Sequence, residues 1–267
     1  MKPRDLHYII EGDRHKPVIL FLHGFMGSSA DFQEVVDLLK DDFCCLLIDL
    51  PEHGKTGRQG EWRENYGMSD VAVAIIELLK KLAIERCFLI GYSMGGRLAL
   101  YLAIFFPHYF LKVVLESASP GLETQLAREE RIKKDLLLAK RLETEDFALF
   151  IEQWYQKPLF ASFVRHPKYQ RAISQRLQNN PFKLAKSLHC LGLGVQPSLW
   201  KGLVKIEVST LLVVGELDSK FVAINQRINS KSLQFKLKIV ENTGHNVHLE
   251  QSQQFAQIVS FFCRAIL

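Results

Sequence analysis

Cysteines and long apolar runs are scarce in this sequence. Five of its 267 residues are cysteines, and no two of them have the C-x-x-C spacing of a metal or redox site. This odd, scattered set favours reduced, buried thiols over a disulfide framework. The longest uninterrupted apolar run, residues 98–106, is about half as long as a membrane-spanning helix. Because residues 1–10 also lack the apolar core of a signal peptide, we expect a cytoplasmic protein without a membrane span.

The sequence also lacks a concentration of charge of one sign. Lys and Arg number 34 and Asp and Glu 29, which leaves a formal net charge of +5 without any long block of like charges. A scattered excess of this size does not form the basic stripe of a nucleic-acid-binding protein, so we expect no nucleic-acid partner. No cluster of His, Asp or Glu has the spacing of metal ligands, and the sequence therefore predicts neither a metal nor a cofactor.

The sequence does contain enough apolar residues for one large core. Hydrophobic residues make up 48% of the chain, and short apolar runs alternate with amphipathic stretches. Apolar runs without internal alternation are typical of parallel strands buried on both faces. The predicted strands are 6–10, 18–22, 44–48, 87–90, 112–116, 210–214 and 236–240, and the predicted helices are 31–39, 69–82 (with Ser69 as N-cap), 95–106 and 252–265. This order predicts an α/β fold with a mostly parallel sheet flanked by helices.

The segment from about residue 120 to 203 interrupts this alternation. It is rich in Arg, Lys, Gln and Leu and contains no convincing strand. Its helical patterns cover residues 126–142, 146–156, 169–178 and 181–191. We interpret the segment as a helical insertion between two strands of one sheet, so that residues 1–267 form a single domain. Such an insertion can form a lid over the carboxyl edge of the sheet, where open α/β sheets bind their ligands.

One serine stands in a turn between a predicted strand and a predicted helix. Residues 91–95 have the sequence G-Y-S-M-G, and a G-x-S-x-G turn in this setting lifts a nucleophile above the sheet edge. We predict Ser93 as the nucleophile and the N–H of Met94 as an oxyanion donor. The turn H-G-F at residues 23–25 follows another buried strand, and the N–H of Phe25 is the predicted second donor. We expect the side chain of His23 to brace this turn.

An acid and a base follow the serine in the chain order Ser–Asp–His. Asp218 comes directly after the predicted strand 210–214, where a carboxylate can orient a histidine, and Glu216 competes with it for this role. His245 follows Gly244, which lets the loop turn toward the serine, and His248 is the competing base. We favour a catalytic triad of Ser93, Asp218 and His245.

Together these segments resemble the α/β-hydrolase superfamily over nearly the whole chain. Residues 50–56, with the sequence L-P-E-H-G-K-T, resemble the superfamily segment D-x-P-G-H-G-x-S. Glu52 stands in place of the first glycine and Thr56 in place of the serine. This departure affects the path of a loop and leaves the predicted triad intact.

Five segments give a narrower resemblance. They are G-Y-S-M-G-G-R at 91–97, S-P-G-L at 119–122, W-Y-Q-K-P-L-F-A-S at 154–162, D-S-K-F at 218–221 and G-H-N-V-H at 244–248. They resemble the 2-succinyl-6-hydroxy-2,4-cyclohexadiene-1-carboxylate synthase family of menaquinone and phylloquinone biosynthesis. The resemblance implies a lyase that eliminates pyruvate from a succinyl-cyclohexene precursor with several carboxylates, and it does not separate the two quinone pathways.

The resemblance also implies which residues bind this small anionic substrate. They are Arg97, Arg131, Arg176, Tyr92 and Trp154. Arg128 is close enough in the sequence to compete with Arg131. A planar guanidinium suits a carboxylate, and a charge beside the nucleophile is out of place in an esterase pocket that takes apolar groups. Two alternatives stay open: a serine hydrolase acting on a small ester or a carbon–carbon bond, and a non-catalytic ligand receptor on the same fold.

Overall fold

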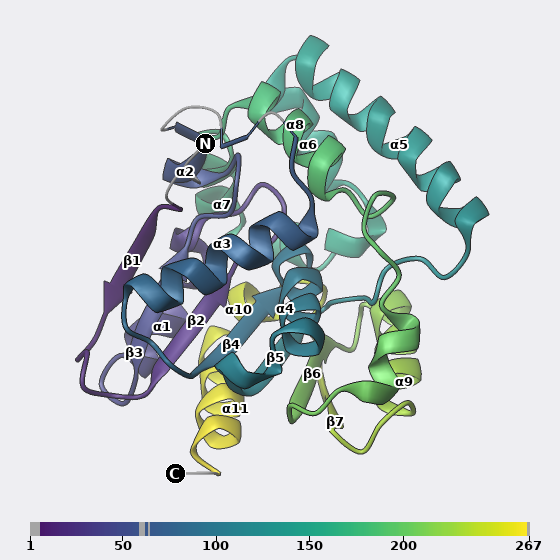
Figure 1. The fold of residues 1–267 in the computed structure, drawn as a ribbon. Helices are drawn as coiled ribbons and strands as arrows, with labels where there is room; N and C mark the ends of the chain where they lie inside the picture. Colours follow the sequence, from purple (N-terminus) through teal and green to yellow (C-terminus); the bar gives the residue numbers. More distant parts are fainter. Residues whose placement is uncertain (1–5, 59–61, 64, 266–267) are drawn as a thin grey trace.

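The computed structural model describes residues 6–58, 62, 63 and 65–265, and a seven-stranded sheet lies at its centre (Figure 1). The strands are β1 (Tyr8–Glu11), β2 (Val18–Leu22), β3 (Cys44–Ile48), β4 (Cys87–Tyr92), β5 (Phe110–Glu116), β6 (Thr210–Gly215) and β7 (Phe235–Val240). Their spatial order is β1-β3-β2-β4-β5-β6-β7. Only β1 runs antiparallel to its neighbour β3, while the other pairs are parallel. All seven strands lie where the sequence predicts them.

Helices lie between these strands and after β7. They are α1 (Gln33–Leu39), α2 (Gly54–Arg58), α3 (Met68–Lys81), α4 (Met94–Phe105), α5 (Gln125–Thr144), α6 (Phe147–Tyr155), α7 (Tyr169–Arg176), α8 (Pro181–Leu191), α9 (Ser219–Asn229), α10 (Val247–Glu250) and α11 (Ser252–Arg264). The predicted cap of α3 is wrong, because the helix begins at Met68 and Gly67 is its N-cap. The N–H of Gly67 donates to the Asp70 carboxylate at 2.8 Å, which satisfies the helix start without Ser69.

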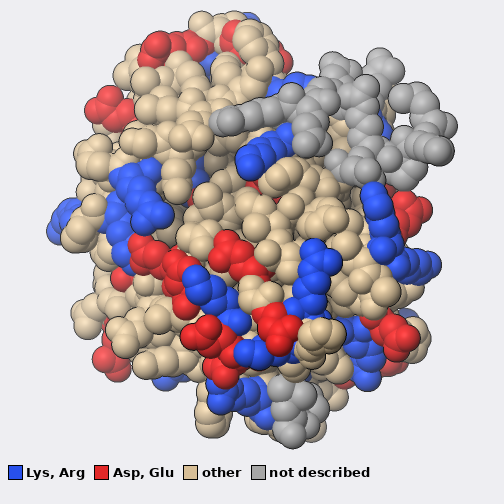
Figure 2. Space-filling model, turned by 90° about the vertical axis from the view of Figure 1, so that its left-hand side faces the viewer, with Lys and Arg blue, Asp and Glu red and all other residues tan. Residues whose placement is uncertain are grey.

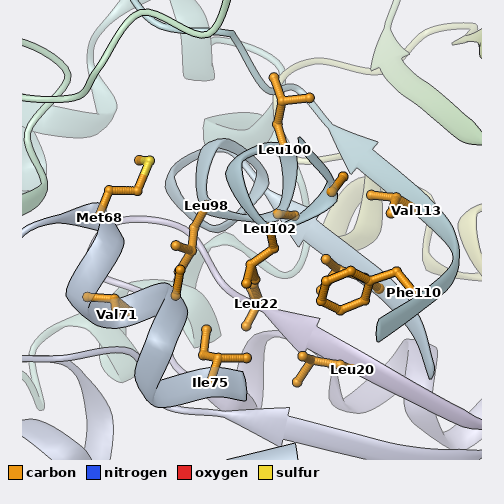
Figure 3. Close-up of a cluster of buried hydrophobic side chains, with 14 of the residues drawn as sticks. Leu20, Leu22, Met68, Val71, Ile75, Leu98, Leu100, Leu102, Phe110 and Val113 are labelled. Carbon is orange, nitrogen blue, oxygen red and sulfur yellow. The ribbon is translucent and has the colours of Figure 1, made fainter. Parts of the chain in front are cut away.

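Alternate side chains of the central strands enter two separate apolar layers. Leu20 and Leu22 of β2 face α3 and α4 (Figure 3), whereas Ile19 and Phe21 face α1 and α11. Successive side chains of a strand point to opposite faces, so a strand that is apolar at every position is buried on both sides. This double burial confirms the predicted sheet flanked by helices.

Four helices, α5 to α8, lie between β5 and β6. In Figure 1, α5, α6 and α8 lie at the top of the view, above the strands. They share an apolar cluster of their own that includes Phe150, Phe163 and Leu184 and takes in Met26 from the loop after β2. The helices therefore form where the sequence predicts them and pack onto the loop that follows β2.

Both signs of charge are mixed on the surface shown in Figure 2, where Lys and Arg side chains lie among Asp and Glu side chains. Within the part of the chain that the structure describes, no helix is long and apolar enough to cross a membrane. The same residues contain no group of three or more His, Cys, Asp and Glu side chains arranged to hold a metal ion. All five cysteines are unpaired, and four of them are buried.

Candidate active site

Ser93 lies in a tight turn between β4 and α4. Its φ is +49°, a left-handed conformation that costs energy for any residue with a Cβ. The turn is held because the Ser93 N–H donates to the carbonyl of Glu116 at 2.9 Å and the Ser93 carbonyl accepts from the Arg97 N–H. A Cβ on Gly95 would lie 2.2 Å from the carbonyl oxygen of Leu22, so only glycine lets α4 pack this closely against β2.

Three segments that are distant in the sequence meet at Ser93. His245 Nε2 lies 3.2 Å from Ser93 Oγ, and His245 Nδ1 lies 2.6 Å from Asp218 Oδ2. Both His245 and Asp218 are buried, with exposed fractions of 2% and 4%. This order of hydroxyl, imidazole and carboxylate is the arrangement in which a histidine accepts the proton of a nucleophile and a carboxylate orients the ring.

The two competing residues face other partners. His248 Nδ1 lies 2.8 Å from the carboxylate of Glu116, and both side chains are fully buried. Glu216 is exposed and accepts a hydrogen bond from the N–H of Asn242 at 3.0 Å. The geometry therefore favours His245 over His248 and Asp218 over Glu216.

The two predicted oxyanion donors lie beside Ser93. Phe25 and Met94 line the same cavity as Ser93 and His245, and neither of their N–H groups has a hydrogen-bond acceptor among the described residues. His23 braces the turn, as expected: its Nδ1 donates to the Gly24 carbonyl at 2.8 Å and its Nε2 accepts from the Leu50 N–H at 2.9 Å. The free N–H groups are therefore held in place by a fully bonded histidine.

A second buried histidine, His53, supports the same turn and makes the stability of the protein depend on pH. Its ring lies 5.7 Å from the ring of Phe25. Burial, followed by the neighbouring His23, lowers the pKa of His53 from 6.5 to about 3. In the unfolded chain His53 therefore binds a proton near pH 6.5, whereas in the folded chain it stays neutral until the pH is much lower. The stabilisation is complete above pH 6.5 and is lost as the pH falls toward 3.

We expect His53 alone to remove about 2 kcal/mol from the free energy of unfolding between pH 7 and pH 5. Urea unfolding at several pH values measures this loss in the wild type and in His53→Gln, which cannot titrate. The variant should have a flatter pH profile over this interval, and His15→Gln, at an exposed position, serves as the control. Parallel profiles for the wild type and His53→Gln would contradict the prediction.

The loop after β3 departs from the superfamily pattern at Glu52, and its backbone explains why a glycine is usual there. Glu52 has a φ of +66°, a conformation that glycine adopts without strain. Its buried carboxylate is faced by Lys183 Nζ at 3.5 Å and Lys186 Nζ at 3.7 Å. Thr56, the other departure, donates its hydroxyl to the Asp49 carbonyl at 2.7 Å, so it still ties the loop together.

The cavity above Ser93 is walled by the turns after β2, β4 and β5, by the start of α9 and by α6 and α8. Trp154 of α6 lines it, as predicted for a pocket residue, and its ring lies 5.4 Å from the ring of Phe25. The ammonium group of Lys157 lies 3.3 Å from the centre of the Trp154 ring, which is a cation–π contact. The helical insertion thus contributes directly to the wall of the cavity.

Arg97 also lines the cavity. Its Nη1 donates to Gln196 Oε1 at 2.7 Å and its Nη2 donates to the Leu191 carbonyl at 3.1 Å. No carboxylate among the described residues lies within ion-pair distance of it. Burial, and next the positive charge of Arg131, lower the pKa of Arg97 to about 10. The guanidinium therefore carries a charge that the protein has not neutralised at short range.

Arg131 lines the same cavity, whereas its competitor Arg128 does not. Arg131 Nε lies 2.7 Å from Asp135 Oδ1, one turn further along α5. Arg128 donates instead to the side chain of Gln125. The structure thus favours Arg131 over Arg128. Unlike Arg97, Arg131 already has a carboxylate partner, Asp135, within the protein.

Arg176 and Tyr92 lie outside the wall of this cavity. Arg176 is buried, with Nη1 2.6 Å from Asp31 Oδ1 and Nε bonded to the Tyr155 hydroxyl at 3.2 Å. Tyr92 donates its hydroxyl to Asn246 Oδ1 at 2.6 Å. Their predicted contact with the substrate stays a prediction: in the described structure Asp31 neutralises Arg176, and Tyr92 packs behind the loop that carries His245.

Several cavity residues were not identified from the sequence. They are Ser117, Ser119, Ser187 and Lys220. Lys220 is the third residue of the D-S-K-F segment that begins with Asp218, so its position two residues after the predicted acid was an available signal. Ser119 opens the S-P-G-L segment, which was likewise an available signal. Ser117 and Ser187 carry no local pattern, because they reach the cavity from the turn after β5 and from α8. Gln196, which holds Arg97, is 99 residues away from it in the sequence.

Comparisons with known proteins agree with this architecture. The sequence profile of the alpha/beta hydrolase fold family matches residues 17–252. A relative from Bacillus subtilis (strain 168), classed with the 2-succinyl-6-hydroxy-2,4-cyclohexadiene-1-carboxylate synthases, is 38% identical over 96% of this chain and 93% of its own length. The synthase of that name from Escherichia coli O1:K1 is 33% identical over 92% and 94% of the two chains.

Two further similarities extend this picture. The solved structure of MenH from S. aureus superposes with a TM-score of 0.92 at 34% identity, covering 97% of this chain and 98% of that one. The chloroplastic protein PHYLLO of Arabidopsis thaliana is 33% identical over 87% of this chain, which spans only 14% of that much longer relative. The chain therefore belongs to the α/β-hydrolase fold family and, within it, to the family of the 2-succinyl-6-hydroxy-2,4-cyclohexadiene-1-carboxylate synthases.

Proposed function

We propose that this chain is a lyase that eliminates pyruvate from a succinyl-cyclohexene precursor to give 2-succinyl-6-hydroxy-2,4-cyclohexadiene-1-carboxylate, in menaquinone or phylloquinone biosynthesis. The observation that carries the proposal is the guanidinium of Arg97, which has no short-range anionic partner in the described structure and lines the cavity that holds Ser93 and His245. A desolvated positive charge is costly in a site for neutral esters, but it suits a substrate with several carboxylates. The relatives that carry this synthase name match nearly the whole chain.

In the proposed reaction, Ser93 and His245 move a proton. His245, oriented by Asp218, accepts the proton of the Ser93 hydroxyl, and the resulting alkoxide removes a proton from a ring carbon of the substrate. The electron pair of that C–H bond forms the new double bond of the conjugated ring diene. The C–O bond to the pyruvyl group breaks, its electron pair leaves with the enolate of pyruvate, and the protonated His245 returns its proton to that enolate. The N–H groups of Phe25 and Met94 stabilise negative charge that develops on a substrate oxygen.

The other site residues bind and orient the substrate in this proposal. Arg97 and Arg131 hold carboxylates, and Trp154 packs against the ring system. Tyr92 supports the loop of His245 from behind, and Arg176 acts indirectly by fixing Asp31 and Tyr155. We propose further that the helical insertion within the single domain is the lid of the site, since Trp154 lines the cavity and its ring contacts that of Phe25. Closing such a site excludes water and favours elimination over hydrolysis.

A cytoplasmic location is part of the proposal. Five unpaired thiols are typical of proteins in a reducing compartment. Burial raises the pKa of Cys45, Cys87 and Cys263 to about 12 each, which keeps these thiols protonated and unreactive.

The proposal is tested by offering the purified protein the succinyl-cyclohexene precursor and following pyruvate. We expect release well above the rate without enzyme, which has to be subtracted because the precursor also loses pyruvate spontaneously. An aryl ester assayed in parallel tests the hydrolase alternative. A burst with the ester and no acceleration of pyruvate release would identify a serine hydrolase, and binding of the precursor without turnover would identify a receptor.

A further inference from the structure

The arginines predicted to bind carboxylates differ in what the protein gives them as partners. Arg131 is bound to Asp135 and Arg176 to Asp31. Arg97 is bound instead to two neutral acceptors, the side-chain amide of Gln196 and the carbonyl of Leu191 at the end of α8. A neutral acceptor orients a guanidinium without cancelling its charge, whereas a carboxylate does both.

Gln196 is built into this position. It lies in the loop after α8, and only 2% of its surface is exposed. Its Oε1 accepts from Arg97 Nη1 at 2.7 Å, while its Nε2 has no hydrogen-bond partner among the described residues. The loop that carries it also packs against Gly121, where an added Cβ would lie 3.1 Å from Gln196 Nε2. The side chain is therefore held by close packing and uses a single polar atom, which faces Arg97.

We propose that Gln196 is a positioning residue that holds the Arg97 guanidinium in the cavity wall through a neutral acceptor and so keeps its charge available for a substrate carboxylate. This inference rests on the proposed function, since it concerns how the site selects an anionic substrate. The inference explains why an amide and not a carboxylate stands at position 196, although a glutamate side chain has nearly the same shape and length. A glutamate there would form a short buried ion pair with Arg97, and an incoming carboxylate would have to compete with it.

The isosteric substitution Gln196→Glu tests this inference directly. The variant keeps the acceptor and the volume and breaks no hydrogen bond, because Nε2 makes none within the described residues. Gln196→Met is the matched variant, since it keeps the approximate volume and the free charge of Arg97 but removes the acceptor. If Gln196 served only packing and hydrogen bonding, the Met variant would be the more damaged of the two. If it keeps the charge free, the Glu variant is.

We expect Gln196→Glu to raise KM for the precursor on the order of 10-fold or more, with kcat changed far less, and Gln196→Met to raise KM no more than about 3-fold. Inhibition by succinate, used as a dicarboxylate probe, should weaken in the same order. Gln257→Glu adds the same charge at an exposed position of α11 and should leave KM and inhibition unchanged. Thermal unfolding of each variant checks the fold, and Gln196→Asp takes the place of a Glu variant that does not fold.

The outcomes separate this inference from the proposed function. An unchanged KM and succinate inhibition in Gln196→Glu, or a larger loss in Gln196→Met than in Gln196→Glu, would overturn the role of the neutral acceptor. A wild-type protein that binds succinate but does not accelerate pyruvate release would overturn the proposed function instead. In that case, the succinate affinities of the two variants still decide whether Gln196 keeps Arg97 free for a carboxylate.

Discussion

Replacing Ser93 with alanine is expected to lower kcat for pyruvate release by about 10³-fold or more while leaving substrate affinity within about threefold. The physical reason is the position of the hydroxyl, which lies 3.2 Å from His245 Nε2 and next to the free N–H groups of Phe25 and Met94. Without the hydroxyl, the protein lacks the alkoxide that would remove the proton from the substrate C–H bond. The carboxylate contacts proposed for Arg97 and Arg131 are untouched, so binding should persist.

Single-turnover and steady-state kinetics measure this loss, and calorimetric titration with the product measures the affinity. Ser174→Ala is the matched control, because Ser174 is an exposed serine of α7 whose hydroxyl donates to the Gln170 carbonyl in its own helix. Its kcat should equal that of the wild type. Wild-type turnover in Ser93→Ala would remove Ser93 from the chemistry, and an equal loss of affinity and turnover would point to a collapsed site.

Replacing Arg97 with alanine is expected to lower kcat/KM by about 10²- to 10³-fold, through a higher KM and a lower kcat. The charge proposed to bind the carboxylate is lost, and the substrate would also no longer be held in register with Ser93, so the cost includes positioning. Arg97→Lys should recover only part of the loss. An ammonium group has a single nitrogen, so it cannot offer a carboxylate the two-pronged geometry of a guanidinium or replace the separate nitrogens that bond to Gln196 and Leu191.

The control for Arg97→Ala is Arg264→Ala at the end of α11, where the arginine pairs with Asp42 in an exposed position. Exposed ion pairs contribute little, on the order of 0–1 kcal/mol, and this one is remote from the cavity. Its kcat/KM should match the wild type. If Arg97→Ala also kept its kcat/KM, Arg97 would have no part in substrate recognition, and the observation that carries the proposed function would lose its meaning.

Local sequence was sufficient to predict the strands and the turn that holds the serine. A strand buried on both faces, such as β2 or β4, is apolar at every position, and this pattern is visible without any knowledge of its neighbours. The turn at Ser93 needs small residues at fixed offsets, because Gly95 approaches the backbone of β2. The predicted start of α3 was wrong by two residues. The Asp70 carboxylate accepts the N–H of Gly67 and so sets the N-cap there, and the apolar pattern of the helix does not show this contact.

The sequence by itself thus determined the sheet, the helical insertion and the order of serine, acid and base, since each depends on local patterns. Only the tertiary structure decided which histidine faces Ser93, because Glu116 on β5 engages His248 and leaves His245 for Asp218. It also decided which arginines have a carboxylate partner within the protein. Charges interact through space, and Gln196 and Asp31, which bond to Arg97 and Arg176, lie 99 and 145 residues away from them in the chain. No local pattern in the sequence specifies contacts at that separation.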